Sequence, residues 1–564
     1  MSRIRYQRSH LSFVGSLALA LALIVSSASM TLAQTGTPAE PPGASGIAST
    51  LEPIPCSTRY QRLEPFIDGQ NLDCSYLSVP AFPGETGSPV MRLHVMRLHA
   101  ATTTPAAEPL IVLTGGPGQG AGSLLPLFVP ATQDQPISYA SLLSRQDVIL
   151  IDQRGTGASE PALSCPGDVS PGLLPPPPAG GATPAAATPI ATPIGATPAP
   201  IIPPTADQTA QFLVSCLRAY QGAGIDLSAF NTENNAADIA ALITALGVPQ
   251  ADLYGISYGS FLGERVISRY PAMIRSAVLA SVVAPDTDIF VSQIEGFNQV
   301  LGDVFGLCAA DPECAANNLN LEGDIETAYQ RLASAPATLN VTDPASGQTF
   351  PVVMDGSTYL TLLYLAAFAS ASYLIPPMIT SVAMGDDTLI TSIAALLVTP
   401  TGIASGLLAS VYCQDFASDI DLDATLAGTG VRPVLIEGFT SSWTSQNQVC
   451  DTLALPVAAP DADAVESQIP TLLASGEFDP ITPPGNADEI IGALPNGQEV
   501  TINAVGHDPI TSSGPCGVQL LSAFLAAPTA ELDTACASQL SLDMSPDELQ
   551  AATPAATPLA TPIG

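Results

Sequence analysis

The sequence predicts an α/β protein, in which a mostly parallel sheet is covered by helices on both faces and an inserted helical segment interrupts the chain. Short apolar runs alternate with segments of helical periodicity along residues 51–284 and again along residues 466–545. The runs are continuously apolar, as expected for strands that are covered on both faces. With 564 residues, the chain can bury one large core or two ordinary ones.

The N-terminus has the organisation of a secretory signal peptide over residues 1–33. Three arginines in the first eight residues precede an apolar run over residues 13–25, and a small-residue cleavage site follows at residues 31–33. An uncleaved membrane anchor is the competing interpretation, although the run is short for a bilayer. No second run is long and apolar enough to span a membrane. We therefore expect a secreted, extracellular protein with no stable membrane insertion after cleavage.

The charge of the chain limits the partners that it can bind. Its formal net charge is −36 at pH 7, and all 15 basic residues are arginine. Cleavage after residue 33 would remove three arginines and no acidic residue, which gives −36 − 3 = −39. Such an acidic surface argues against nucleic acid and anionic lipid as partners.

Ten cysteines follow the predicted signal peptide, and an even number in an exported chain predicts disulfides. Pairing neighbours in order gives five bridges, although the sequence leaves the connectivity open: Cys56–Cys74, Cys165–Cys216, Cys308–Cys314, Cys413–Cys450 and Cys516–Cys536. Metal binding is the competing interpretation, but no Cys-x-x-Cys or His-x-x-x-His spacing occurs, so we expect no metal.

Three segments are too rich in Pro, Ala, Thr and Gly for a packed core. These are a linker over residues 34–50, a loop insertion over residues 171–205 and a tail over residues 546–564. Repeated proline removes backbone donors, so we expect extended, solvated chain. A cell-wall spacer or glycosylated stalk is the functional interpretation, which would imply cell-wall association. A tolerated surface insertion is the simpler one.

The remaining elements follow from their periodicity. The expected strands are the apolar runs 109–113, 148–151, 253–255, 277–283, 471–474 and 500–504. A helix over residues 236–246 should end at Gly247 as its C-cap, and another should span residues 261–270. Residues 285–465 break the alternation with helical patterns at 325–332, 359–368 and 389–397, which indicates an inserted, mainly helical cap domain.

A serine stands at the turn between the 253–255 strand and the 261–270 helix. The segment reads Gly255-Ile256-Ser257-Tyr258-Gly259, with glycine two residues on either side of the serine. This is the pattern of a nucleophile elbow, a turn so sharp that bulky neighbours do not fit beside the exposed serine. The pattern predicts Ser257 as a nucleophile.

A nucleophilic serine needs a base, and the base needs a carboxylate that holds its tautomer. In chains with this elbow the order is Ser, acid, His, and His507 is the only histidine after Ser257. It follows an apolar strand, which predicts it as the base. Asp479 follows the strand that ends near Ala474 and is the predicted acid. Glu477 and Asp508 are the rivals for that role.

Acyl transfer also needs backbone donors for the developing oxyanion. The amide of Tyr258 is one candidate, and the loop Thr114-Gly115-Gly116-Pro117-Gly118-Gln119-Gly120 after the 109–113 strand offers the other, for which we favour Gly116. A glycine-rich loop after a strand could instead bind phosphate. The chain, however, contains no lysine and the loop lacks the spacings of nucleotide-binding motifs, so we expect no cofactor.

Taken together, these motifs resemble the α/β-hydrolase peptidases of the proline iminopeptidase and tripeptidyl aminopeptidase group. The resemblance runs along most of residues 55–540 and includes the glycine-rich loop, the elbow, the Asp479 loop, Gly506-His507 and the motif Asp152-Gln153-Arg154-Gly155-Thr156-Gly157. It implies the α/β-hydrolase fold. Arg154 is interpreted as structural, bracing the loops around the site.

The resemblance implies an exopeptidase that acts at a free amino terminus, where acids of the cap bind the substrate ammonium. Asp286 and Glu295, where the cap begins, are the candidates for that role, and solvated loop acids are the simpler interpretation. Two departures bear on the substrate class. Thr114 stands where the family usually has His, and residues 280–285 lack an expected acid-glycine pair.

The sequence thus predicts a secreted serine exopeptidase that acts on peptides, with Ser257, His507 and Asp479 as the triad. A carboxylesterase with the same triad is the alternative, because acyl chemistry does not itself separate esters from amides. A secreted binding protein that keeps an inactive hydrolase fold is a third.

Overall fold

The structure is a computed structural model that describes residues 50–57, 65–106, 108–130, 138–165, 168, 205–285, 288–342, 347, 349–398, 402–418, 420–457 and 465–544. The predictions for the signal peptide, the 34–50 linker, the 171–205 insertion and the 546–564 tail fall outside these residues, except at Thr50 and Thr205.

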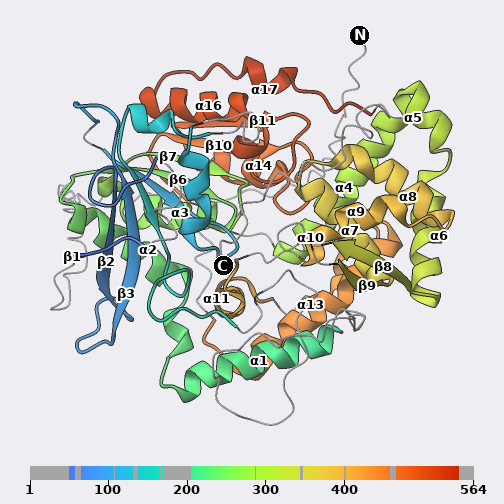
Figure 1. Cartoon of the computed structure of the whole chain (residues 1–564), viewed down its shortest axis with the longest axis horizontal. Helices are drawn as coiled ribbons and strands as arrows, with labels where there is room; N and C mark the ends of the chain where they lie inside the picture. The colour runs from blue at the N-terminus through green and yellow to red at the C-terminus, as the bar shows by residue number, and fades with distance from the viewer. Residues whose placement is uncertain are drawn as a thin grey trace, which may run out of the picture. The chain divides into compact units, whose positions relative to one another are not determined.

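In this part of the chain, nine strands form one sheet in the order β1-β2-β3-β5-β4-β6-β7-β10-β11 (Figure 1). The strands are β1 (Leu51–Ile54), β2 (Leu72–Pro80), β3 (Val90–Leu98), β4 (Leu110–Leu113), β5 (Val148–Ile151), β6 (Ala251–Ile256), β7 (Ile274–Ala280), β10 (Thr471–Gly476) and β11 (Gly497–Ile502). From β5 to β11 every neighbouring pair is parallel, whereas β1, β2 and β3 join antiparallel at one edge. The mostly parallel sheet is confirmed.

Helices cover both faces of the sheet, which explains why its central strands are continuously apolar. One face packs on α1 (Ala206–Gly222), η4 (Leu227–Ala229), α2 (Thr232–Leu246), α3 (Tyr258–Arg269) and α14 (Gly485–Ile491). The other packs on η2 (Ala121–Phe128), η3 (Leu142–Ser144), α15 (Pro509–Ser512), α16 (Pro515–Ala526) and α17 (Ala535–Gln539). Every residue of β4, β5 and β6 is buried.

The predicted core elements are present, with shifted ends. Helix α2 ends at Gly247, whose φ of 71° is the left-handed C-cap that the sequence predicted. Helix α3 begins at Tyr258, three residues earlier than expected, so it starts directly after Ser257. Strand β7 ends at Ala280, because Ser281 turns away with φ of 54°. The expectation of strand through residue 283 is therefore wrong.

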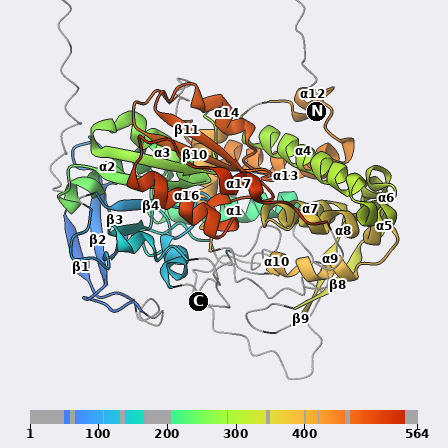
Figure 2. The ribbon, with the colours of Figure 1, turned by 90° about the horizontal axis from the view of Figure 1, so that it is seen from above.

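A second hydrophobic cluster is built mainly from the segment between β7 and β10, and Phe478 and Met544 join it from outside the segment. Its elements are α4 (Ile289–Ala310), α5 (Pro312–Asn317), α6 (Leu321–Ser334), β8 (Ala337–Thr342), β9 (Thr349–Met354), α7 (Gly356–Phe368), η6 (Ser372–Leu374), α8 (Ile375–Ala383), α9 (Thr388–Ile393), α10 (Ala395–Val398), α12 (Leu422–Leu426) and part of α13 (Pro433–Leu453). Figures 1 and 2 both show α6, α7 and α8 grouped together.

The segment differs from its prediction in two elements. The antiparallel hairpin β8–β9 was not expected, and the single helix expected over residues 389–397 is divided into α9 and α10. Helix α11 (Ser405–Val411) and the π-helix η7 (Tyr412–Phe416) belong to the same hydrophobic cluster as α1 and α3, which cover one face of the sheet. The hydrophobic contacts of the segment therefore extend to the face of the sheet that α3, the helix after Ser257, covers.

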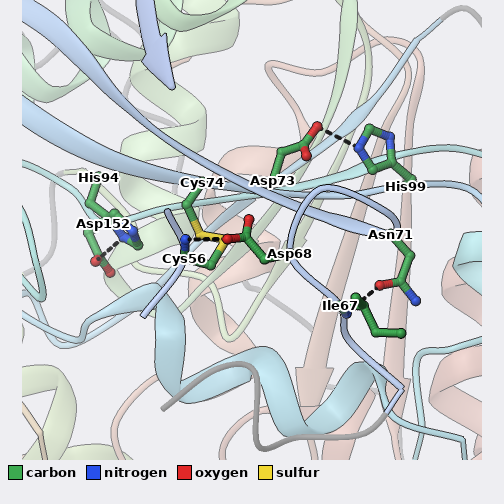
Figure 3. Close-up of a disulfide and its surroundings, with 9 residues drawn as sticks. All are labelled: Cys56, Ile67, Asp68, Asn71, Asp73, Cys74, His94, His99 and Asp152. Atoms are coloured by element: carbon green, nitrogen blue, oxygen red, sulfur yellow. Dashed lines mark hydrogen bonds and ion pairs between the residues drawn. A yellow bond between two sulfur atoms is a disulfide. The ribbon is translucent and has the colours of Figure 1, made fainter. Parts of the chain in front are cut away.

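All ten cysteines lie among the described residues and form the five disulfides expected from pairing neighbours in order. Figure 3 shows the first of them, Cys56–Cys74, which ties the chain after β1 to β2. Beside it, the Cys56 amide donates to Asp68 at 3.1 Å.

Within the described ranges, no helix has both the length and the apolarity needed to cross a membrane. The same ranges contain no group of three or more His, Cys, Asp or Glu side chains arranged to hold a metal ion.

Candidate active site

The candidate site lies where three parallel strands end at the same edge of the sheet. Ile256 of β6 pairs with Ala280 of β7, and Ala280 pairs with Ala474 of β10. The Ser257 amide donates to the Ala280 carbonyl at 2.9 Å, and the Ser281 amide donates to the Ala474 carbonyl at 2.8 Å. Ligand sites of open α/β sheets lie at this carboxyl edge of the strands.

Ser257 has the strained backbone of a nucleophile elbow. Its φ of 57° and ψ of −125° are rarely adopted by a residue with a side chain. A Cβ on Gly255 would lie 2.2 Å from the Gly259 carbonyl oxygen, and one on Gly259 would lie 2.0 Å from the Leu113 carbonyl oxygen. Only glycine fits at either position, so the two glycines permit the turn that exposes Ser257.

Asp479 and His507 face each other across the loops that follow β10 and β11. Asp479 Oδ2 and His507 Nδ1 are 2.9 Å apart, and both side chains are buried. Burial alone raises the pKa of the Asp479 carboxyl, but the charge of His507 and the hydrogen bonds to the carboxylate outweigh burial and lower it. The acid is therefore held ionised, as a carboxylate that orients a histidine must be.

Sequence reasoning missed two hydroxyl groups that complete the surroundings of this carboxylate. The Thr482 hydroxyl donates to Asp479 Oδ2 at 2.6 Å, and the Ser281 hydroxyl donates to the same oxygen at 3.1 Å. The amides of Ile481 and Thr482 both donate to Oδ1 at 3.0 Å. The spacing of Asp479 and Thr482 is typical of an Asx-type turn and could have indicated Thr482. Nothing local in the sequence indicated Ser281.

The glycine-rich loop passes directly beside the serine. A Cβ on Gly115 would lie 2.9 Å from Ser257 Cβ and 3.4 Å from its Oγ. Gly116 has a φ of 107°, in the region that favours glycine. The loop thus lies close enough for one of its amides to serve as an oxyanion donor. The roles of the Gly116 and Tyr258 amides stay predictions.

Thr114 closes the glycine-rich loop, which gives a structural role to the residue that departs from the family pattern. Its hydroxyl donates to the Gln119 carbonyl at 2.7 Å, across the loop. Gln153 Nε2 donates to the Thr114 carbonyl at 2.9 Å and so joins this loop to the one after β5. Arg154 of the same motif is fully buried and makes a bidentate ion pair with Asp238, as expected for a structural residue.

The rival acids have other partners. Glu477 Oε2 accepts a hydrogen bond from the Ala504 amide at 2.8 Å. Asp508 is the N-cap of α15 and accepts from the Thr511 amide at 3.3 Å. Asp479 is therefore the carboxylate that bonds the His507 ring.

The two earlier histidines among the described residues, His94 and His99, lie on or next to the antiparallel edge of the sheet. Figure 3 shows His94 facing Asp152 and His99 facing Asp73, at 3.1 and 2.7 Å. The choice of His507 as the candidate base is consistent with these positions.

Of the two candidates for an ammonium site, the structure describes only one. Asp286 lies outside those residues. Glu295 is exposed on α4. The next residue, Gly296, packs on the acid loop, since a Cβ there would lie 2.9 Å from the Pro480 carbonyl oxygen.

Two family descriptions match the chain. The "alpha/beta hydrolase fold" family matches residues 108–304, which include the glycine-rich loop and the elbow. The "TAP-like protein" family matches residues 434–536, which include Asp479 and His507.

Curated relatives match at low identity. The chain is 28% identical to the tripeptidyl aminopeptidase of Streptomyces lividans over 221 residues, which are 38% of this chain and 36% of that protein. It is 25% identical to the serine protease Hip1 of Mycobacterium tuberculosis over 272 residues, which are 48% of this chain and 47% of that protein. The chain thus spans between one third and one half of the length of these relatives.

Among solved structures, proline iminopeptidase from Mycobacterium smegmatis aligns with 81% of this chain and 99% of its own, with a TM-score of 0.36 and 15% identity.

Proposed function

This chain belongs to the α/β hydrolases, with a TAP-like C-terminal segment, and from that premise we propose that it is a secreted serine aminopeptidase that hydrolyses peptide bonds near a free N-terminus. The observation that carries the proposal is the buried Asp479–His507 pair at the strand ends beside the Ser257 elbow. The predicted signal peptide and the five disulfides support secretion.

The proposed reaction is acyl transfer through a covalent intermediate. Ser257 Oγ bonds to the scissile carbonyl carbon while His507 Nε2 takes the hydroxyl proton, and Asp479 holds the Nδ1–H. The proton then passes to the leaving amine as the C–N bond breaks. Water hydrolyses the acyl-enzyme by the same route. The amides of Gly116 and Tyr258 would bind the oxyanion, and no step requires a cofactor.

The names of the curated relatives favour a peptide over an ester as the substrate, because one is a tripeptidyl aminopeptidase and the other a serine protease. A secreted carboxylesterase with the same residues is the second candidate. A matched panel separates the two. It contains mono-, di- and tripeptidyl nitroanilides with a free amine, their N-acetylated forms and a butyrate ester. Cleavage that requires the free amine supports the aminopeptidase, whereas ester turnover without amide cleavage would replace it by the esterase.

Replacing the nucleophile tests the chemistry itself. We expect Ser257→Ala to lower turnover by at least ~10³-fold, because the remaining groups cannot form the acyl-enzyme. Circular dichroism should show unchanged folding, and a fluorophosphonate probe should label the parent but not the variant. Turnover within about tenfold of the parent would discard Ser257 as the nucleophile. A parent that the probe does not label would point instead to an inactive hydrolase fold.

A further inference from the structure

The end of α7, from the inserted segment, lies directly against the loop that carries His507. The His507 amide donates to the Phe368 carbonyl at 3.0 Å, and the Gly506 amide donates to the Ser370 hydroxyl at 2.8 Å. A Cβ on Gly506 would lie 2.0 Å from the Ala367 carbonyl oxygen. The two segments are therefore in backbone contact, and only glycine permits this approach.

The Phe368 ring stacks on the imidazole of His507. Their centroids are 4.6 Å apart and their planes differ by 24°. Phe368 is half-buried, while His507 is only 8% exposed. The face of an aromatic ring carries negative potential, so a ring in this position both fixes the imidazole plane and favours the imidazolium that forms when a base takes a proton.

A second aromatic residue on the same face of α7 is affected by the charge of the acid. Tyr364 lies one turn before Phe368, and burial, followed by the charge of Asp479, raises the pKa of its hydroxyl. Beyond the helix end, Ser370 has a φ of 59°, in the left-handed region that favours glycine. Its hydroxyl is held against Gly506 in this conformation.

The inserted segment also contacts the other two loops of the site. Gly296 of α4 packs on the Pro480 carbonyl in the acid loop. The Ala404 amide donates to the Gly118 carbonyl at 2.9 Å, and Gln119 pairs with Ile403 as an isolated β-bridge. The acid, base and glycine-rich loops are thus all packed against it.

We propose that Phe368 and Ser370 are positioning residues for the base, so that the inserted segment is a fixed part of the catalytic frame. The inference rests on the proposed function, since it takes His507 as the base of Ser257. Phe368 fixes the ring and favours the imidazolium, and Ser370 fixes the backbone of Gly506 and His507.

The test measures the second-order rate constant for reaction of Ser257 with a fluorophosphonate. The serine oxygen bonds to phosphorus, fluoride leaves, and His507 takes the serine proton. This readout needs the base but no particular substrate. The variants are Phe368→Leu, which removes the ring, Phe368→Trp, which keeps an aromatic face, and Ser370→Gly, which removes the hydroxyl at a backbone that suits glycine. The control is Phe305→Leu, which removes a ring of α4 that packs under Arg432.

We expect Phe368→Leu to slow phosphonylation by about tenfold. It should lower kcat for p-nitrophenyl butyrate by the same factor, while KM stays within about twofold of the parent value. Phe368→Trp should recover to within about threefold of the parent, and Ser370→Gly should lose about fivefold. Phe305→Leu should react like the parent.

Parental phosphonylation rates in both Phe368→Leu and Ser370→Gly would overturn the inference. A raised KM with unchanged kcat would also overturn it, since Phe368 would then be a substrate contact. An unlabelled parent refutes the proposed function instead, so the two failures are distinguishable. Ser370→Gly keeps the test decisive if Phe368→Leu does not fold.

Discussion

At the residue scale, the Asp479 carboxylate joins three parts of the site. It accepts hydrogen bonds from Ser281, which follows β7, from Thr482 on its own loop, and from the ring of His507. The first two fix the carboxylate, and the third fixes the imidazole. Losing a hydrogen bond that fixes the carboxylate should therefore lower kcat much less than losing the charge that stabilises the imidazolium.

We expect Asp479→Asn to lower kcat by about 10⁴-fold, because an amide donor facing Nδ1 favours the wrong tautomer of His507. Ser281→Ala is the matched comparison, and it should lower kcat by only about threefold to tenfold, since the carboxylate and its other donors remain. The measurement is kcat for the best substrate of the panel, with thermal melting as the folding check. Equal losses in the two variants would contradict separate roles for the charge and the fixing hydrogen bond.

Three residues of the candidate site could be predicted from the sequence, because their positions depend on chain order and on where strands end. Ser257 lies in a local pattern, His507 is the only histidine after it, and Asp479 follows an apolar run. Ser281 and Phe368 could not be predicted. The contact of Ser281 depends on the register between β7 and β10, and that of Phe368 on the packing of α7 against a loop distant in sequence. Neither leaves a local signal.

At the element scale, the π-helix η7 places Asp415 against the start of α2. Asp415 Oδ2 accepts from the Thr232 amide at 2.9 Å and from the Thr232 hydroxyl at 2.5 Å. Thr232 Oγ1 in turn lies 3.0 Å from the Tyr258 hydroxyl. Burial raises the pKa of Asp415 to about 6. Single-turn π-helices often occur at functional sites, and this one is linked through Thr232 to the residue after the candidate nucleophile.

This pKa makes stability depend on pH. In the unfolded chain an aspartate has a pKa of about 3.9, so between pH ~4 and ~6 the folded state binds a proton that the unfolded state lacks. The contribution of Asp415 to stability is therefore fully present below pH ~4 and is lost as pH rises through ~6. Asparagine does not titrate, so the stability of Asp415→Asn should not fall in this way. We expect the free energy of unfolding of the variant, relative to that of the parent, to be about 2 kcal/mol higher at pH 7.5 than at pH 4.

Urea unfolding of both proteins at the two pH values measures this difference. Asp423→Asn, at an exposed position on α12, is the control and should change in parallel with the parent. A constant difference between Asp415→Asn and the parent across this range would show that the buried carboxyl does not titrate there.

Local periodicity located elements better than it located their ends. The helix expected over residues 389–397 is divided at Ala394. The β8–β9 hairpin was not predicted, because the prediction for this segment relied on helical spacing. The end of β7 depends on Ser281, which turns toward Asp479 although apolar residues follow it. Tertiary contacts decided these boundaries, and a single sequence does not contain them.

At the scale of the whole molecule, described residues anchor the chain on both sides of the 171–205 segment. Cys165 and Cys216 are both buried in the cluster of α1 and α3, with their Cα atoms 5.9 Å apart. Asp168 accepts a hydrogen bond from the Ser405 amide at 3.3 Å, and Thr205 caps α1 with a capping box. Each end of the segment is thus held by contacts among described residues.

Replacing residues 172–200 by a 12-residue Gly/Ser linker should therefore leave the protein active and stable. Loop closure changes only slowly with length, and the disulfide already holds the ends together, so the free energy of unfolding should change by less than about 1 kcal/mol. Removing both Cys165 and Cys216 is the comparison, with an expected loss of about 2–5 kcal/mol. Urea unfolding and kcat/KM on the peptidyl panel measure both. If the shortened protein unfolds like the parent but loses more than about tenfold in kcat/KM, the Ala-Thr-Pro segment acts on substrate and is not a tolerated insertion.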